Sequence, residues 1–256
     1  MTKFLLIRAD DLGYSEGVNH GIRKSVVDGL IRSVGLMPNM EAAVHGFELV
    51  RDLDIALGQH TSVCIGRPVA DAAQIPSLVG PDGQFKPSRA FREAYAAGED
   101  FVDFAEAKIE VRAQLERFRA ICGRDPDYFE GHAVASSTLM AAIEEVRQEE
   151  GLRPSCMAFD GSVTVLPSGR EVRCCGVGSM SPDYDARGWL EQEVLAAPEG
   201  STSVYICHPG YLDEYILNNS TLTRGRPKET AMLCDPTTRA WLDAHGVELI
   251  DYRNLD

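Results

Sequence analysis

The sequence predicts an α/β fold, in the form of an irregular (β/α) barrel of the TIM type with mostly parallel strands. Short apolar runs alternate with segments of helical periodicity along the chain, which is the pattern of strand–helix–strand units. The length of 256 residues matches the usual size of such a barrel, about 250 residues. No G-x-G-x-x-G motif or P-loop follows the first apolar run, which disfavours a nucleotide-binding fold. We therefore expect a single domain over residues 1–256, which need not contain all eight repeats.

The first sixty residues alternate expected strands with expected helices. The expected strands are the apolar runs at residues 4–7, 31–37 and 55–59. Ser15 is a suitable N-cap for the first helix. Val18, Ile22 and Val26 recur four residues apart and give that helix one apolar face. A second helix is expected at residues 41–51, where the apolar face is less regular.

Residues 61–100 are expected to form an irregular connection. This stretch contains four prolines and four glycines, a composition that does not build a regular core element. A connection of this length inside a compact domain is usually functional, as a lid or a binding loop. We therefore expect it to contribute to substrate specificity.

The rest of the chain alternates strands and helices with less regular spacing. Helices are expected at residues 101–122, from Ser136 or Ser137 to Gly151, at 184–197 and at 228–245, and strands at 128–132, 203–207 and 247–252. Residues 152–178 are expected to hold two short strands around residues 167–169, and residues 211–226 a second irregular loop. Proline has no backbone N–H, so Pro236 must break or kink the last helix.

Composition excludes several classes of function. The net charge of −14, without a basic stripe, argues against a nucleic-acid partner, because like charges repel. No run of about 18 apolar residues is present, so no membrane span is expected. No secretory signal is recognised at the start, and the seven cysteines include no C-x-x-C pair. We therefore expect a cytoplasmic protein with free thiols and no cysteine chemistry.

Two adjacent carboxylates, Asp10 and Asp11, close the first expected strand just before Gly13. Successive side chains of a strand point to opposite faces, so both carboxylates can face one site only if the chain is already turning there. Such a pair suits a division of labour in which one carboxylate holds a metal and the other handles protons. The alternative is that Asp10 caps the following turn or helix.

Three histidines also end expected strands: His60, His132 and His208. The carboxyl ends of barrel strands share one face, where active sites are built. Two imidazoles and a carboxylate with open positions suit a catalytic divalent ion; zinc fits such a set, whereas magnesium prefers more oxygen ligands. These groups would suffice to hydrolyse an amide or an ester. Alternatively, each histidine alone could be a hydrogen-bonded rim residue.

The remaining histidines, His20, His45 and His245, fall in or near expected helices, and we expect them to be surface or capping residues.

Motifs along almost the whole chain resemble those of the YdjC-like carbohydrate deacetylases, which include the chitooligosaccharide deacetylases. The matching segments are Ala9-Asp10-Asp11-Leu12-Gly13 with Val18-Asn19 and Gly21-Ile22, Gly58-Gln59-His60 with Gly66-Arg67-Pro68-Val69, Gly123-Arg124 and Pro126 before His132, Cys207-His208-Pro209, and Arg226-Pro227-Lys228-Glu229. The resemblance implies an irregular α/β barrel. It also implies a small acetylated carbohydrate as substrate, from whose N-acetylglucosamine-type units an acetyl group is removed.

The resemblance implies one divalent ion, either Mg²⁺ or Zn²⁺, and magnesium is commonly recorded for the family. By the matching motifs, Asp11, His60 and His132 would hold this ion.

The same resemblance assigns the remaining roles. Asp10 would be the catalytic base, and His208 would be the acid that protonates the departing amine. Arg67 and Arg226 would contact the sugar hydroxyls or the acetyl group.

One departure from the family pattern concerns the residues after His132. Relatives commonly carry a His-x-His-x-His run, whereas this chain has His132-Ala133-Val134-Ala135-Ser136. The ligand position is retained, and small residues replace the later imidazoles. We therefore expect a substrate other than chitobiose.

Alternatives remain for the activity. The same barrel fold would suit a metal-dependent phosphoesterase or another amidohydrolase, and an inactive carbohydrate-binding relative is a third possibility. A homodimer is expected on base rates alone.

Overall fold

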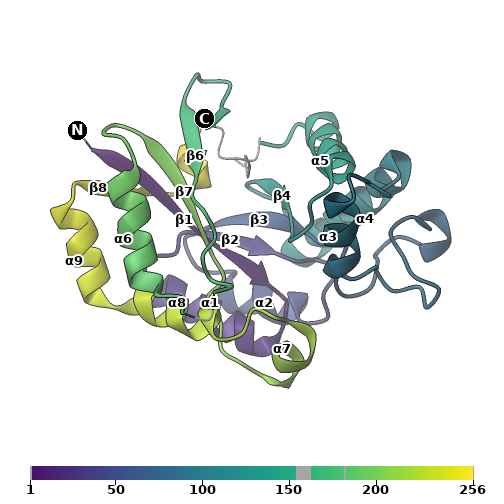
Figure 1. Cartoon of the computed structure of the whole chain (residues 1–256), viewed down its shortest axis with the longest axis horizontal. Helices are drawn as coiled ribbons and strands as arrows, with labels where there is room; N and C mark the ends of the chain where they lie inside the picture. The colour runs from purple at the N-terminus through teal and green to yellow at the C-terminus, as the bar shows by residue number, and fades with distance from the viewer. Residues whose placement is uncertain (1, 154–162, 182, 256) are drawn as a thin grey trace.

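A computed structural model of the chain describes residues 2–153, 163–181 and 183–255. Its centre is an eight-stranded, mostly parallel sheet in the order β4-β3-β2-β1-β7-β6-β5, with β8 also paired to β1 (Figure 1). The strands are β1 (Lys3–Leu12), β2 (Ser33–Leu36), β3 (Ala56–Thr61), β4 (Phe129–Gly131), β5 (Val163–Val165), β6 (Glu171–Cys174), β7 (Thr202–Cys207) and β8 (Val247–Ile250). Within the described residues β4 and β5 are the two edges of this curled sheet, so the predicted α/β barrel is confirmed as an incomplete, half-barrel form.

Strand β1 is the central strand of the sheet. Its residues Phe4 to Ala9 pair with β7 on one side. On the other side its first half pairs with β8 and its second half with β2. The expected strand at residues 4–7 is therefore correctly placed but too short, because β1 continues through Asp10 and Asp11.

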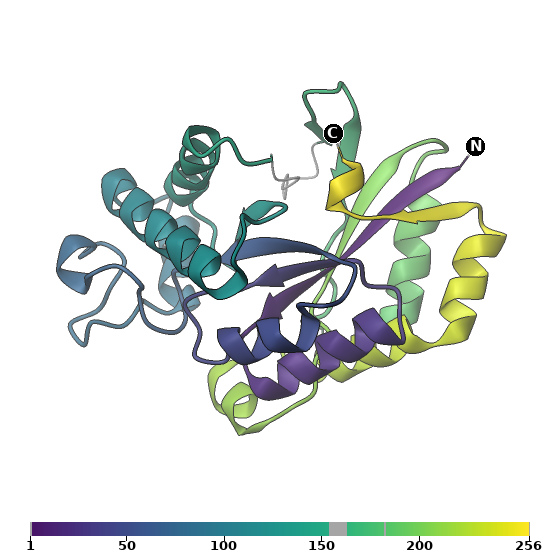
Figure 2. The same cartoon turned by 180° about the vertical axis from the view of Figure 1, so that it is seen from behind.

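Helices cover the convex side and both ends of the sheet (Figures 1 and 2). They are α1 (Glu16–Val27), α2 (Ala43–Val50), α3 (Ser88–Ala96), α4 (Phe104–Cys122), α5 (Ser137–Glu149), α6 (Ala186–Ala196), α7 (Glu214–Asn219), α8 (Gly225–Cys234) and α9 (Pro236–Ala244). Helices α1, α2 and α8 lie side by side beneath the sheet, α6 and α9 lie beside β7 and β8, and α4 and α5 lie beyond β3 and β4.

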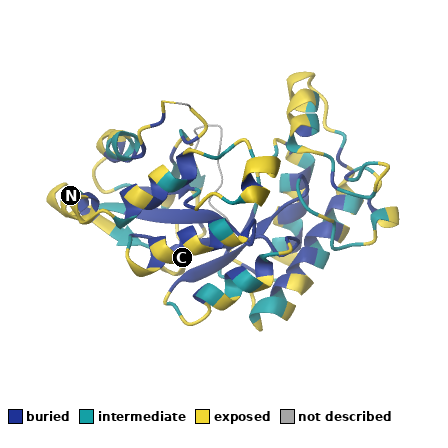
Figure 3. Cartoon of the chain, turned by 90° about the horizontal axis from the view of Figure 1, so that it is seen from below, coloured by how far each residue is buried: buried dark blue, intermediate teal, exposed yellow. Residues whose placement is uncertain are grey.

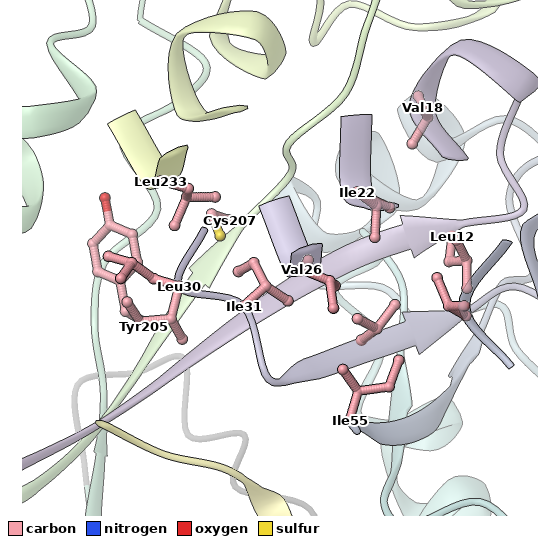
Figure 4. Close-up of a cluster of buried hydrophobic side chains, with 14 of the residues drawn as sticks. Leu12, Val18, Ile22, Val26, Leu30, Ile31, Ile55, Tyr205, Cys207 and Leu233 are labelled. Carbon is pink, nitrogen blue, oxygen red and sulfur yellow. The ribbon is translucent and has the colours of Figure 1, made fainter. Parts of the chain in front are cut away.

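Successive side chains of β1 point alternately to the two faces of the sheet, and the two faces have different surroundings. Leu5, Ile7 and Ala9 point toward the helices and join the main apolar core. That core includes the predicted face of α1, with Val18, Ile22 and Val26, as Figure 4 shows. Burial of each such aliphatic side chain stabilises the fold by about 1.5–3 kcal/mol. The opposite face of β1 carries Leu6, Arg8 and Asp10 into the concave side of the half-barrel.

Several local predictions are confirmed. Ser15 accepts a hydrogen bond from the Val18 N–H at the start of α1, and Ser136 does the same for Leu139 at the start of α5. The two short strands expected within residues 152–178 are β5 and β6, an antiparallel pair. Pro236 starts a new helix, so the single helix expected at residues 228–245 is two helices.

The irregular segments contain more structure than expected. Residues 61–100 include a 3-10 turn (Ala72–Gln74) and helix α3. Helix α3 buries Phe91 in a second apolar cluster with residues of α4 and α5. Residues 211–226 likewise contain α7 and the start of α8. The expectation of irregular structure is therefore wrong for these helices, and the expected lid function stays a prediction.

Burial follows the layers of the fold. Strands β2, β3 and β7 are buried along their whole length and β5 is largely exposed, whereas the helices turn one face to solvent (Figure 3). Within the described part of the chain, no helix combines the length and the apolar character needed to cross a membrane.

Candidate metal centre and catalytic site

Asp11 leaves regular strand geometry, and this departure shapes the site. Its φ is 76°, in the left-handed region that aspartate tolerates better than most residues. The register between β1 and β2 also shifts between Ala9 and Leu12. The chain therefore turns at the position where the sequence argument requires a turn, and Asp10 and Asp11 both approach His60.

Three potential ligand atoms form a small triangle at the carboxyl ends of β1, β3 and β4. His132 Nδ1 lies 3.1 Å from Asp11 Oδ1, His60 Nε2 lies 3.4 Å from the same oxygen, and the two nitrogens are 2.9 Å apart. Ligands at right angles around a cation with bonds of about 2.1 Å are about 3.0 Å apart. The triangle therefore fits one small divalent cation.

The environment of Asp11 supports the same fit. Asp11 is 1% exposed, and its Oδ1 accepts no well-directed hydrogen bond from any described residue. Its other oxygen accepts a hydrogen bond from Arg226 Nη2 at 2.8 Å. A buried anionic oxygen is costly unless a cation or a donor approaches it, and here two imidazole nitrogens lie within 3.4 Å of it. Two imidazoles and this carboxylate thus form a donor set of the two-histidine, one-carboxylate type.

Glu130 orients His60. The side chain of Glu130 is fully buried, and its Oε1 lies 3.1 Å from His60 Nδ1. Because Nδ1 faces this carboxylate, Nε2 is the nitrogen left to face Asp11 and His132. A carboxylate behind a ligating histidine fixes the tautomer and the ring orientation and makes the ligand more basic.

Arg8 contacts two carboxylates on the concave side of the sheet, those of Asp10 and Glu130. It donates from Nε to Asp10 Oδ1 at 2.7 Å and from Nη2 to Asp10 Oδ2 at 2.8 Å. Its Nη1 forms an ion pair with Glu130 and donates to Tyr252 Oη at 3.0 Å. The bidentate pair is possible because Arg8 and Asp10 are two residues apart on the strand and share a face.

Two glycines leave room for this cluster. A Cβ on Gly35 of β2 would lie 3.1 Å from Glu130 Oε1 and 3.1 Å from His60 Cβ. A Cβ on Gly58 of β3 would lie 2.3 Å from the Tyr128 ring, which stacks on Tyr252 at a centroid distance of 3.8 Å. The aromatic pair therefore lies beside Arg8, which donates to the Tyr252 hydroxyl.

The charges of the site perturb its protonation. Burial penalises the anion of Asp10, but Arg8 outweighs this effect and lowers the pKa of that carboxyl. Burial acts in the same way on Asp11, and Arg226 and His132 bring the pKa of Asp11 well below its usual value.

The histidines of the triangle respond to the same charges. Burial disfavours the imidazolium, yet Asp10 and Glu130 raise the pKa of His60 to about 10. For His132, Asp11 overcomes burial and raises the pKa to about 9. The contact of 2.9 Å between His60 Nε2 and His132 Nδ1 allows a proton on one of these two nitrogens, and a metal cation bound there would have to displace it.

His208 directly follows β7, close enough to Asp11 and Asp10 for their charges to act on its imidazole. Burial lowers the pKa of His208 to about 4, against the attraction of Asp11 and Asp10. Its Nδ1 is buried and has no hydrogen-bond partner among the described residues. His208 is therefore a neutral imidazole with a free ring nitrogen near the two carboxylates.

The two predicted substrate arginines occupy different environments. Arg226 is 1% exposed, and its Nη1 lacks a hydrogen-bond partner within the described chain. Arg67 is exposed, in the loop after β3, where its carbonyl lies 3.4 Å from Asn39 Nδ2. The structure therefore brings Arg226 into the cluster with Asp11 and leaves the Arg67 side chain at the surface.

The other histidines lie away from the cluster. His20 and His45 form an edge-to-face pair on α1 and α2, at a centroid distance of 5.3 Å. His245 caps α9, where its ring stacks on Trp241. The described cysteines are free thiols, as expected, and Cys156 lies outside the described residues.

Sequence reasoning missed three buried charged residues of the site, Arg8, Glu130 and Glu229. A signal was available for two of them, since Arg8 precedes Asp10 by two residues and Glu130 precedes His132 by two. In a strand that spacing places side chains on one face.

These features define an α/β half-barrel protein with a histidine–carboxylate cluster at the carboxyl ends of its parallel strands. The chain matches the profile of the family described as YdjC-like protein over residues 4–244, and it belongs to that family.

Curated relatives extend over the whole chain. A carbohydrate deacetylase of Geobacillus stearothermophilus is 31% identical over 264 residues, covering 100% of this chain and 99% of the relative. A carbohydrate deacetylase of Mus musculus is 28% identical over 302 residues, covering 98% and 94%.

Solved structures share the fold. The crystal structure of a proposed cellobiose-phosphate cleavage protein from Enterococcus faecalis aligns with a TM-score of 0.81 at 22% identity, covering 100% of this chain and 99% of that one. A family 4 acetyl xylan esterase from Clostridium thermocellum, solved with a cobalt ion, aligns with a TM-score of 0.54 at 9% identity, covering 99% and 90%.

Proposed function

We propose that the protein is a metal-dependent hydrolase that removes the N-acetyl group from an amino sugar or a related acetamido compound. The observation that carries this proposal is the triangle of Asp11, His60 and His132, beside a second carboxylate and a neutral histidine. The carbohydrate deacetylases among the relatives support the substrate class.

One divalent ion, Mg²⁺ or Zn²⁺, would be held by Asp11, His60 and His132. Such an ion supplies a Lewis acid that activates water and polarises an acyl carbonyl. Glu130 would hold His60 in the ligating orientation, and Arg226 would fix the carboxylate of Asp11.

Asp10 would accept the proton of the attacking water. Arg8 keeps this carboxylate ionised and fixes both of its oxygens, so its position does not depend on the substrate. A positioned base of this kind typically contributes 10²–10⁴-fold to the rate.

His208 would protonate the departing amine. It starts neutral because burial lowers its pKa, so it must receive a proton before donating it, and the proton that Asp10 takes from the attacking water would balance the one delivered to the amine. Developing negative charge near Asp10 and Asp11 would favour that uptake, because an imidazolium is stabilised by neighbouring anions.

Arg226 and Arg67 would contact the substrate. The free Nη1 of Arg226 is a buried donor close to Asp11, which suits an acetyl oxygen. Arg67 at the surface suits the sugar hydroxyls. Ala133 and Ala135 are exposed after His132, where small side chains leave room for a substrate other than chitobiose.

The direct test is acetate release from chitobiose and from a panel of other acetamido sugars, before and after treatment with a chelator. We expect metal-dependent release, with a preferred substrate other than chitobiose. Strong preference for chitobiose would overturn the substrate prediction. Hydrolysis of phosphate esters without acetate release would favour the phosphoesterase alternative, and binding of sugars without turnover would favour an inactive relative.

A further inference from the structure

Glu229 of α8 is a buried carboxylate that the reaction described above does not use. It is 1% exposed. Its Oε2 accepts the backbone N–H of His208 at 2.6 Å, and its Oε1 accepts the hydroxyl of Tyr184 at 2.9 Å. Burying a carboxylate in a helix–sheet interface is costly unless it is well hydrogen-bonded, so this contact with the His208 backbone is a specific feature of the fold.

One face of α8 contacts both Asp11 and the segment that carries His208. Arg226, Glu229 and Thr230 are three and four residues apart and therefore neighbours on the helix. Arg226 donates to Asp11 at 2.8 Å, and the Thr230 hydroxyl accepts the Gly210 N–H at 2.9 Å. One rigid helix thus fixes the metal-side carboxylate and the segment that carries His208.

Helix α1 confines this segment from its other side. A Cβ on Gly21 would lie 2.4 Å from Gly210 Cα, so the two backbones are in direct contact. The segment from His208 to Gly210 is therefore held between α1 and α8, and the only side chain that contacts the His208 backbone N–H is Glu229 among the described residues.

We propose that Glu229 is a positioning residue, which fixes the backbone of His208 so that its imidazole stays beside Asp10 and Asp11. This inference rests on the proposed function, in which His208 donates a proton. Glu229 does not touch the imidazole, so it acts only through the main chain. A misplacement of about 1 Å at a catalytic group can cost 10²-fold in rate, which sets the scale of the expected effect.

The test compares two variants of similar shape. Glu229→Met keeps the length and removes the acceptor, whereas Glu229→Gln keeps an acceptor for the His208 N–H. We expect Glu229→Met to lower kcat by about 10–100-fold with KM and metal affinity unchanged. Glu229→Gln should recover most of that loss. Equal activity of the two variants would overturn the inference.

Tyr184→Phe is the matched control. It removes the other hydrogen bond of the same carboxylate and leaves the acceptor for His208 in place. We expect its kcat to stay within about threefold of the wild type. A loss as large as that of Glu229→Met would show a general structural role and would contradict positioning.

A spectroscopic readout separates this inference from the proposed function. The short bond to a carboxylate should shift the His208 backbone amide downfield in the NMR spectrum. Glu229→Met should move that resonance upfield and change the His208 ring resonances, whereas Tyr184→Phe should change neither. If the wild type released no acetate, the proposed function would be wrong. The NMR spectra of Glu229→Met and Tyr184→Phe would still decide whether Glu229 positions His208. Unchanged ring resonances in Glu229→Met would overturn that inference.

Discussion

At the scale of single residues, the tasks proposed for Asp10 and His132 can be separated by substitution. Asp10→Asn removes the proposed proton acceptor and leaves the Asp11, His60 and His132 triangle unchanged. We expect metal binding within a few-fold of wild type and turnover lowered by at least about 100-fold. Metal content after dialysis and initial rates measure the two effects. A fully active Asp10→Asn variant would contradict the proton-transfer role.

The complementary substitution is His132→Ala. It removes one corner of the triangle, and we expect loss of bound metal together with activity. Retention of stoichiometric metal would show that the ion is held elsewhere.

Metal binding should also release protons. His60 and His132 have pKa values raised to about 10 and about 9, and their facing nitrogens, 2.9 Å apart, share one proton in the metal-free protein. A cation must displace this proton. We expect release of about one proton per ion at pH 7, and metal affinity that falls as the pH is lowered. Calorimetry in buffers of different ionisation enthalpy measures the number, and zero release would argue against both histidines as ligands.

The candidate cluster was predictable from the sequence in its strand-end residues but not in their supports. Asp11, His60 and His132 follow apolar runs and were expected at one sheet edge, where the structure places them. Arg8 and Glu130 lie inside strands, two residues before Asp10 and His132, and that spacing indicates a shared face but not a role. Their importance depends on which strands are neighbours, and periodicity does not specify strand order.

At the scale of elements, the contact between α1 and the His208 segment is unusually close. Gly21→Ala places a Cβ 2.4–2.8 Å from the backbone of Gly210 and Tyr211. Alanine favours helix by about 1 kcal/mol over glycine, but overpacking against fixed backbone costs about 1–3 kcal/mol. We expect a net loss of stability and lower turnover, measured by thermal unfolding and initial rates.

Gly188→Ala in α6 is the control for that change. The three atoms nearest its Cβ position belong to the side chain of Asp185, the N-cap of α6, and none of them is backbone. We expect unchanged or slightly higher stability. If both variants had the same melting temperature, close backbone contact at Gly21 would not constrain the fold.

Element prediction succeeded where caps and apolar faces are strong and failed where burial depends on distant contacts. The N-caps of α1 and α5 and the apolar face of α1 were recognised correctly. Helix α3 was missed because it buries only Phe91, and prolines and glycines flank it. Its stability comes from packing with α4 and α5, which the local sequence does not encode.

At the scale of the whole molecule, stability should depend on pH through Glu229. Burial raises the pKa of Glu229 to about 7 from a usual value of 4.5. The folded chain therefore keeps a proton that the unfolded chain releases between these values, and the wild type loses stability as the pH rises from about 4.5 to 7.

Glu229→Gln removes this titration. Relative to wild type, we expect the variant to gain stability between pH 4.5 and 7, by on the order of 3 kcal/mol at most. Denaturant unfolding at several pH values measures the difference. A difference that did not change with pH would contradict a raised pKa.

The extent of closure of the sheet could not be predicted from the pattern of strands and helices alone. Closure depends on whether the first and last strands meet, and β4 and β5 remain the edges of the described sheet. The order of strands and helices predicted the fold class, and the chain length was consistent with a barrel of the usual size. The sequence also did not indicate that β8 and β2 would pair with successive parts of β1.

The central position of β1 has a consequence for motion. This strand pairs with β2, β7 and β8 and also carries Arg8, Asp10 and Asp11, so opening it would require breaking three ladders at once. In hydrogen–deuterium exchange, the amides of Ile7 and Ala9 should be among the last to exchange, well after those of residues 211–222. The ten-residue strand would then be a stationary frame for these three charged side chains.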